Sequence, residues 1–446
     1  SRESSLILVT GRRRVGKTRL IKEFIDGRGA MYYFAQEMNG PMMLRDFSAV
    51  LSRHTGRTYG EFERWMDAFR AFAESSDGRK ILVIDEFPNM IDTEDGFLSM
   101  FQEAWDEVLS KSSATVILCG SHMTVMESLD KDRDSPLYGR FSRHIVVNPL
   151  PFTTVYASTG GEFTDAVERY AVLGGVPGYM GLFDGRSLRE NVLDNVMDRS
   201  AMMFDDPKVL LGEEVKNVAT YMSVMAAVAG GNRRISDIAS AIQVPATTLT
   251  SYLSRLIDIH VLRRTVPVTE KNPERSRSGL YSVADDYTAF WFRFVRPYMS
   301  ELELGHTEWA MSRFDAHFVE GHVAFVFEDI CREQTRSMSG IIGFTPERVG
   351  SYWSRDVEVD VLAINDSERR AFAAECRYHK ANPVDNHVLN DLRRKVASIP
   401  ELKGYDVTFG LFSVSGFDER VMSERDVVLV DCGAPVDHRP APARHG

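Results

Sequence analysis

Residues 11–18 have the types and the spacing of a loop that binds phosphate. They read Gly-Arg-Arg-Arg-Val-Gly-Lys-Thr, with two glycines, a lysine and a hydroxyl residue in the order that a triphosphate requires. Glycine lets main-chain N–H groups wrap phosphate oxygens, and the start of a helix adds positive potential. Lys17 would reach the β- and γ-phosphates, and the Thr18 hydroxyl would ligate Mg²⁺. The sequence therefore predicts a site for a magnesium-bound nucleoside triphosphate.

The residues on either side of this loop suit a strand and a helix. Residues 6–9 are an apolar run typical of a buried parallel strand, and residues 19–25 have apolar residues at helical spacing. The order strand, loop, helix separates a phosphate loop from a chance match in a glycine-rich turn. We therefore expect ATP to be bound along the loop, by Gly11, Arg12, Arg13, Arg14, Val15, Gly16, Lys17, Thr18 and Arg19.

Two later apolar runs end in polar residues. Residues 81–84 are followed by Asp85 and Glu86, which resemble the end of the Walker B strand of P-loop ATPases. The resemblance implies that Asp85 holds Mg²⁺ together with Thr18 and that Glu86 polarises the attacking water. Residues 116–119 are followed by Gly120 and Ser121, and Ser121 resembles the polar sensor residue of the same superfamily. The alternative for Ser121 is an ordinary turn at a strand end.

The sequence of the loop resembles that of the archaeal-type ATPases, which are part of the signal-transduction ATPases with numerous domains (STAND) in the AAA+ class. Residues 135–140 (Ser-Pro-Leu-Tyr-Gly-Arg) and 173–179 (Leu-Gly-Gly-Val-Pro-Gly-Tyr) resemble the same family. The resemblance implies that Arg140 is an arginine finger and that residues 173–179 form the turn of a helical lid. The family usually has a Gly-Arg-Glu box upstream of the loop. Here Ser1-Arg2-Glu3 directly precede the first strand, so we expect a truncated or processed start.

The order of predicted elements indicates an α/β fold with several domains. Strands and helices alternate at first, which favours a parallel sheet with helices on both faces. We expect five segments, namely a P-loop ATPase core (1–157), a helical lid (158–215), a winged helix (216–300), a smaller α/β restriction-endonuclease-like domain (301–432) and a disordered tail (433–446).

The predicted winged helix carries a local excess of positive charge. Apolar spacing predicts two short helices, and residues 261–266 and 279–283 read as two antiparallel strands. Between residues 253 and 277 there are six Lys or Arg against three acids. Contact with DNA phosphates is one interpretation, and a protein-docking module is the other.

The last domain contains a spaced set of acids that could act on a phosphodiester. Glu328 lies in an apolar helix, Asp360 in an alternating strand and Glu375 in a second strand that a hairpin would place beside the first. This set is similar to the restriction-endonuclease core, in which two carboxylates share Mg²⁺. Arg377 stands where that core has lysine, and arginine cannot serve as a general base. An active nuclease and a decayed fold kept as a scaffold both remain open.

Composition sets further limits. The formal charge of −11 argues against a globally basic nucleic-acid binder, and the four cysteines form no Cys-x-x-Cys pair. We therefore expect neither a zinc site nor disulfides, and a cytoplasmic location. No apolar run approaches the roughly 18 residues that span a membrane. The sequence predicts an ATP-hydrolysing switch with ATP and Mg²⁺ as its ligands, possible contact with DNA and possible homo-oligomers. A nucleotide-gated DNA-binding regulator and a functioning nuclease are the alternatives.

Overall fold

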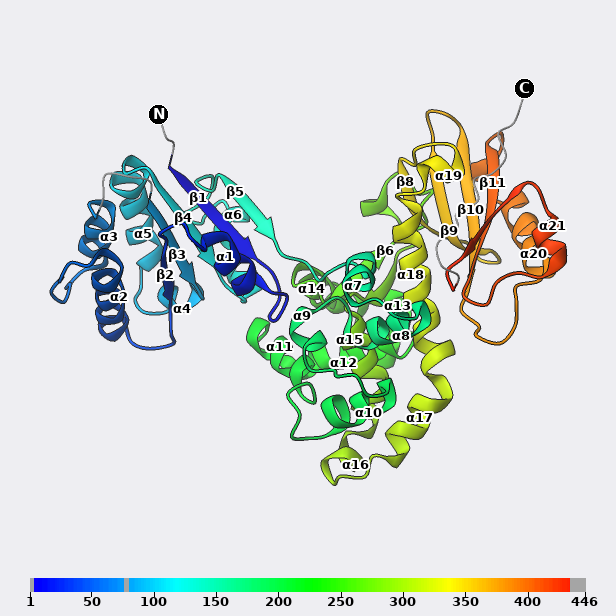
Figure 1. Cartoon of the computed structure of the whole chain (residues 1–446), viewed down its shortest axis with the longest axis horizontal. Coiled ribbons are helices and arrows are strands. Elements are labelled where there is room, and N and C mark those ends of the chain that lie inside the picture. The colour runs from blue at the N-terminus through cyan, green and yellow to red at the C-terminus, as the bar shows by residue number, and fades with distance from the viewer. Residues whose placement is uncertain (1–3, 76–79, 434–446) are drawn as a thin grey trace. The chain divides into compact units, whose positions relative to one another are not determined.

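The computed structural model describes residues 4–75 and 80–433, which form two compact units (Figure 1). The N-terminal unit runs to residue 150 and also takes in residues 176–181 and 210–216. The C-terminal unit contains residues 151–175, 182–209 and those from 217 onward. The Ser1-Arg2-Glu3 segment and the expected tail after Gly433 lie outside the described residues.

A sheet of five parallel strands forms the centre of the N-terminal unit. The strands are ordered β2-β3-β4-β1-β5. Their bounds are β1 Ser5–Thr10, β2 Met31–Phe34, β3 Lys80–Asp85, β4 Ala114–Cys119 and β5 Arg143–Val146. Every residue of β3 and β4 is buried, as expected for central strands covered on both faces. The predicted α/β fold with a parallel sheet is confirmed.

Helices cover both faces of this sheet (Figure 1). On one face, α1 (Lys17–Ile25) packs through Ile21 against a group of strand side chains that includes Val83 and Cys119. The other face is covered by an aromatic-rich core from α2 (Gly40–Thr55), α3 (Trp65–Ala73) and α5 (Phe97–Glu107). The unit also contains α4 (Pro88–Ile91), α6 (Met123–Lys131), α9 (Pro177–Met180) and the end of α11 (Asp206–Glu214).

The C-terminal unit begins with helices. Three of them, α12, α13 and α14, are followed by the antiparallel pair β6 and β7. Helices α13 and α14 and the two strands match the two helices and two strands that the sequence predicts, whereas α12 was not predicted. Their bounds are α12 Val218–Ala229, α13 Ile235–Ile242, α14 Ala246–Asp258, β6 Leu262–Thr265 and β7 Leu280–Val283. Around them lie α7 Phe152–Thr159, α8 Phe163–Leu173, α10 Leu188–Val192, α15 Asp286–Phe294, α16 Met299–Glu303 and α17 Glu308–Phe318.

A second five-stranded sheet closes this unit, ordered β12-β11-β10-β9-β8. Strands β8, β9 and β10 are antiparallel neighbours, whereas β10, β11 and β12 run parallel. Helices α18 and α20 pack on this sheet (Figure 1). The bounds are α18 Ala324–Thr335, α19 Ser339–Ile342, β8 Arg348–Trp353, β9 Glu358–Asn365, β10 Arg370–Arg377, α20 Asn386–Ala397, β11 Asp406–Ser413, α21 Glu419–Ser423 and β12 Val427–Asp431.

The loop between β6 and β7 lies along the edge strand β8. The Val268 N–H donates to the Ser351 carbonyl at 2.9 Å, and Arg348 Nη1 donates to the Val268 carbonyl at 2.6 Å. Trp353 Nε1 donates to the carbonyl of Ser278 at 3.1 Å. The β6–β7 hairpin is therefore fastened to the second sheet.

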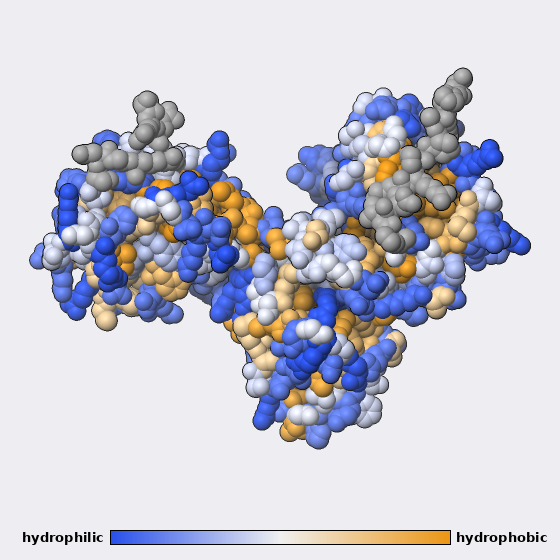
Figure 2. All heavy atoms as spheres, viewed as in Figure 1, coloured by the Kyte–Doolittle hydropathy of each residue, from blue (hydrophilic) through white to orange (hydrophobic). Residues whose placement is uncertain are grey.

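On the face drawn in Figure 2, hydrophilic residues cover much of the surface, with smaller groups of apolar residues between them. Two of the most exposed apolar side chains are Leu304 and Trp309, next to and within α17. Over residues 4–75 and 80–433, no helix combines the length and apolar character needed to cross a membrane.

Candidate active site

The predicted phosphate loop lies between β1 and α1. Gly16 has φ +99°, a left-handed conformation that glycine adopts at little cost. A Cβ on Gly11 would lie 2.4 Å from the carbonyl oxygen of Val147, so that position also requires glycine. Arg14 is left-handed as well, with φ +68°, which is uncommon for a residue with a side chain. The glycines of the motif therefore stand where the backbone needs them.

Lys17 folds back over this loop. Its Nζ donates to the carbonyl oxygens of Gly11 at 2.6 Å and Arg12 at 2.9 Å, and its side chain is buried. Burial lowers the pKa of Lys17, while the nearby charges of Glu86 and Asp85 act in the opposite direction. The ammonium group is thus held at the loop by neutral carbonyl groups, which an anionic ligand can replace.

Asp85 and Thr18 meet at the end of β3. Thr18 Oγ1 donates to Asp85 Oδ2 at 2.8 Å, which joins a carboxylate and a hydroxyl beside Lys17. Such oxygen donors suit Mg²⁺, which completes its shell with phosphate oxygens and water. Among residues 4–75 and 80–433, no group of three or more His, Cys, Asp or Glu side chains is arranged to hold a metal ion. Thr18 and Asp85 are the two oxygen donors that the sequence predicts for Mg²⁺, and the structure places them in contact.

Glu86 and Ser121 also come together, from the ends of β3 and β4. The main-chain N–H of Ser121 donates to Glu86 Oε2 at 3.2 Å, and Ser121 Oγ lies 3.2 and 3.1 Å from the two carboxylate oxygens. Glu86 has φ +56°, a strained conformation of the kind found at functional sites. Glu86, predicted to polarise the attacking water, and Ser121, predicted as a sensor residue, are thus in direct contact.

The remaining predicted loop residues differ in their surroundings. Arg12 and Val15 are buried, whereas Arg13 pairs with Glu213 at 2.7 Å. The carbonyl of Arg14 accepts a hydrogen bond from Gly178, and a Cβ on Gly178 would lie 2.7 Å from Arg14 Cβ. The Pro-Gly turn at residues 177–178 therefore packs directly on the loop. The exposed side chain of Arg19 pairs with Glu23 along the helix, so its predicted contact with the nucleotide stays a prediction.

Arg140 is engaged away from the loop. Its Nε and Nη2 donate to the carboxylate of Asp106 on α5, the shortest distance being 2.7 Å, and Nη1 donates to the carbonyl of Pro136 at 2.9 Å. The Asp106 hydrogen bond raises the pKa of Arg140. A role at the γ-phosphate would require this ion pair to open.

Sequence reasoning missed several residues of this region. Tyr32 on β2 donates its hydroxyl to Asp85 Oδ2 at 2.7 Å. Glu214 accepts hydrogen bonds from the N–H groups of Met123 and Thr124 at the start of α6, which follows Ser121. Glu213, which pairs with Arg13, also influences Lys17 by its charge. These contacts join residues far apart in the chain and belong to no motif.

The four residues of the predicted nuclease site are also brought together, on α18, β9 and β10. Burial, followed by the charge of Asp360, raises the pKa of Glu328 to about 8 and raises the pKa of Glu375. Arg377 lies 2.8 Å from Glu375 and 3.5 Å from Asp360. Arg332 lies 3.4 Å from Glu328.

Lys395 on α20 joins this carboxylate cluster and has no counterpart in the sequence interpretation. Its Nζ donates to Glu375 Oε1 at 2.9 Å, while Glu375 itself is almost fully buried. Burial lowers the pKa of Lys395, but the hydrogen bonds and charges of Glu375 and Asp391 together outweigh burial, so the pKa is raised. Glu375 is therefore neutralised by two cations.

The predicted DNA-contacting charges are partly engaged inside the unit. Arg263 pairs with Asp329 of α18, and Arg264 donates to the carbonyls of Pro273 and Ser276 within its own hairpin. Lys271, Arg275 and Arg277 are exposed in the same loop. The excess of positive charge available to a partner is therefore smaller than the residue count indicates.

Two protein families match parts of this chain. Residues 1–183 match an ATPase domain described as predominantly from Archaea. Residues 291–389 match DUF234, described as archaeal and bacterial proteins of unknown function. Residues 1–183 are thus similar to an archaeal-type ATPase domain, and residues 291–389 are similar to DUF234. The phosphate loop, Asp85, Glu86 and Ser121 all lie within residues 1–183, which are called the ATPase domain after this match.

The relatives found by sequence come from Methanocaldococcus jannaschii. The uncharacterized protein MJECL04 is 28% identical over 436 residues, which are 97% of this chain and 95% of that protein. The uncharacterized protein MJ0424 is 32% identical over 83 residues, 18% of this chain and 79% of its own length.

Solved structures also resemble the chain. The Walker-type ATPase paby2304 of Pyrococcus abyssi is 20% identical, with a TM-score of 0.48, and the match covers 65% of this chain and 91% of that one. The Aeropyrum pernix ORC2 protein, in ADPNP and ADP complexes, is 12% identical with a TM-score of 0.47, covering 68% of this chain and 88% of that one.

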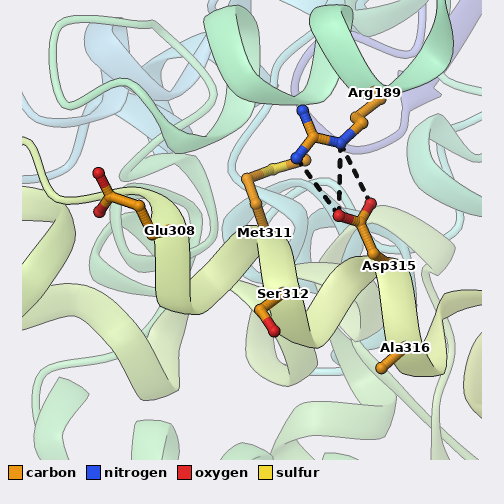
Figure 3. Close-up of a pocket in the computed structure, with 6 residues that line it drawn as sticks. All are labelled: Arg189, Glu308, Met311, Ser312, Asp315 and Ala316. Carbon is orange, nitrogen blue, oxygen red and sulfur yellow. Dashed lines mark hydrogen bonds and ion pairs between the residues drawn. The ribbon is translucent and has the colours of Figure 1, made fainter.

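One surface hollow of the C-terminal unit is lined by none of the residues predicted for either site (Figure 3). It lies between α10 and α17 and is lined by Arg189, Glu308, Met311, Ser312, Asp315 and Ala316. The side chains of Arg189 and Asp315 form an ion pair at 3.2 Å across it. The hollow contains none of the residues predicted for catalysis.

Proposed function

We propose that the chain is an ATP-hydrolysing switch, in which nucleotide bound to the ATPase domain controls the segments that follow. The observation that carries this proposal is the shared geometry of Lys17, Thr18, Asp85 and Glu86 at one end of the parallel sheet. A phosphate loop, a strand-end carboxylate pair and a polar Ser121 are the parts that phosphoryl transfer to water requires.

Each residue would then have a defined task. Lys17 exchanges the Gly11 and Arg12 carbonyls for phosphate oxygens, and the loop N–H groups bind the remaining charge. When bound, Mg²⁺ would neutralise charge on the β- and γ-phosphates, held by Thr18 and Asp85. Glu86 orients and deprotonates the attacking water, while Ser121 holds the Glu86 carboxylate in place. Arg140 would stabilise the γ-phosphate after leaving Asp106.

The proposal is tested by two substitutions that separate binding from chemistry. Lys17→Ala should abolish nucleotide binding in calorimetry. Glu86→Gln should keep binding and lower ATP turnover by about 100-fold or more, because general-base assistance is lost. Lys111→Ala and Glu107→Gln, which disrupt an exposed helical ion pair, are matched controls. Equal binding by Lys17→Ala and Lys111→Ala, or equal turnover by Glu86→Gln and Glu107→Gln, would contradict the proposal.

For the remaining segments we propose a lid (158–215), a winged helix (216–300) and an endonuclease-like fold (301–432) that acts without cleavage. The ion pairs of Glu375 with Arg377 and Lys395 support a scaffold rather than a metal-dependent nuclease. DNA contact is proposed for α14, whose Thr247, Thr250, Ser251 and Ser254 are exposed, together with the exposed Lys271, Arg275 and Arg277 of the β6–β7 loop.

The nuclease and regulator alternatives separate on one assay. Wild type and Asp360→Ala are incubated with DNA and Mg²⁺, and duplex binding is measured at two salt concentrations. We expect salt-sensitive binding and no cleavage by either protein. Cleavage by wild type that Asp360→Ala loses would establish the nuclease and overturn the scaffold proposal. Absence of both binding and cleavage would instead favour protein docking.

A further inference from the structure

Asp85 is surrounded by hydrogen-bond donors from several elements. Its Oδ2 accepts from Thr18 at 2.8 Å and from the Tyr32 hydroxyl at 2.7 Å, while Oδ1 accepts from the N–H of Glu86 at 3.1 Å. Thr18 and Glu86 belong to the two motifs already described. Tyr32 belongs to neither, and it reaches Asp85 from the neighbouring strand.

The sheet explains how Tyr32 reaches this carboxylate. Strands β2 and β3 are parallel, with Tyr32 opposite Val83 and Phe34 opposite Asp85. Because side chains alternate along a strand, Tyr32 shares the α1 face of the sheet with Val83 and Asp85. Tyr33 points to the other face, where its hydroxyl donates to the carbonyl of Met43 at 3.0 Å.

Helix α1 also contacts the Tyr32 ring. Lys22 Nζ lies 5.3 Å from the ring centroid, in the position of a cation–π contact. The ring is thus fixed between α1 and β3, with its hydroxyl directed at Asp85. A tyrosine in a strand is common for packing reasons alone, so the sequence carries no sign of this contact.

We propose that Tyr32 is a positioning residue for the Mg²⁺ site, and this inference rests on the proposed function. Thr18 must direct its hydroxyl oxygen at the metal while the hydroxyl hydrogen continues to donate to Asp85. The Tyr32 hydroxyl donates to the same carboxylate oxygen, so the carboxylate would keep its orientation when Thr18 binds the metal. Hydrogen bonds of this kind orient metal ligands in many sites, and losing one weakens metal affinity about tenfold or more.

The test compares two neighbouring tyrosines. Tyr32→Phe and Tyr33→Phe each remove one hydroxyl and one hydrogen bond, but only the first contacts Asp85. Calorimetry measures the affinity of the whole chain for a non-hydrolysable ATP analogue, with Mg²⁺ and with a chelator. The ratio of the two affinities gives the contribution of Mg²⁺. We expect Tyr32→Phe to lower this ratio about tenfold, to leave the affinity with chelator unchanged, and to lower turnover at limiting Mg²⁺. Tyr33→Phe should change neither the ratio nor turnover.

The outcomes separate this inference from the proposed function. Wild type that fails to bind the analogue, or binds it equally with and without Mg²⁺, would remove the Mg²⁺-ATP site itself. Wild type with a Mg²⁺ contribution that Tyr32→Phe retains in full would overturn the Tyr32 assignment alone. Equal loss in both variants, accompanied by lower melting temperatures, would show a packing effect and also overturn it.

Discussion

The two units each gather acidic side chains at strands, but they treat the negative charge differently. In the ATPase domain, Asp85 and Glu86 receive hydrogen bonds from hydroxyl and main-chain N–H groups, which are neutral. In the carboxylate cluster, Glu375 and Asp360 face Arg377, and Glu375 also faces Lys395. In one site the carboxylates are met by neutral donors, and in the other they are met by cations of the protein itself.

The kind of partner that a charged group has distinguishes a group that can bind a ligand from a member of a buried ion-pair network. Both regions have shifted pKa values, so a shift alone does not identify function. What differs is whether the partners of the charged group can be exchanged for a ligand. Carbonyl and hydroxyl partners can be replaced by a ligand at little cost. Removing one member of a buried charge pair lowers the free energy of unfolding by several kcal/mol.

Substitution of Glu375 should lower the free energy of unfolding more than the other changes. Glu375→Gln removes the charge shared by Arg377 and Lys395, and we expect a loss of about 3 kcal/mol in the free energy of unfolding. Denaturant unfolding of the whole chain measures the loss. Glu368→Gln is the matched control, because its pair with Arg370 is exposed and spans 4.0 Å; its cost should stay below about 0.5 kcal/mol. Similar costs for both variants would show that the cluster contributes no special stability.

A smaller effect should appear as pH dependence at Glu328. Its pKa is raised to about 8 in the folded state, so folding favours the protonated form. The stability that this proton confers is complete below the unfolded pKa of about 4.5 and is lost as pH rises toward 8. Glu328→Gln stays neutral and should therefore be more stable than wild type at pH 8, by on the order of 2 kcal/mol, with little difference at pH 5. Parallel stability curves for the two proteins from pH 5 to 8 would contradict the shift.

Of the three substitutions, the one at Asp85 should change stability least. Asp85→Asn keeps an oxygen that can accept from Thr18 and Tyr32, and the Lys17 ammonium keeps its carbonyl partners and the nearby charge of Glu86. We therefore expect a change in the free energy of unfolding of about 1 kcal/mol or less, although Mg²⁺-dependent nucleotide binding should be lost. Thermal unfolding of Asp85→Asn and Glu375→Gln, measured side by side, checks the change in stability. Calorimetry with nucleotide and Mg²⁺ checks the loss of binding. A cost at Asp85 as large as that at Glu375 would remove the proposed distinction.

The parallel sheet was predictable because its strands carry strong local signals. The runs that end at Asp85 and Ser121 are apolar, of strand length and followed by polar residues. The β9–β10 hairpin was predictable for a similar reason, since alternation and a turn at residues 365–367 fix the pairing. The meeting of Asp360 and Glu375 follows directly from that register.

Contacts between distant segments could not be predicted. Lys395 lies on a helix whose position depends on how α20 packs over β10, and Glu214 reaches Met123 across 91 positions of sequence. Counting charges in residues 253–277 also could not reveal that Arg263 turns toward Asp329. Such pairings depend on packing, for which one sequence offers no periodic signal.

The contact between Val268 and Ser351 gives the second sheet a protected border. An edge strand normally offers free N–H and carbonyl groups to other chains, which promotes aggregation. Here the β6–β7 loop occupies part of that border on β8, so the length of a surface loop affects the solubility of a sheet some 80 residues later. Shortening this loop would expose the N–H and carbonyl groups of β8, and other chains could then pair with that edge.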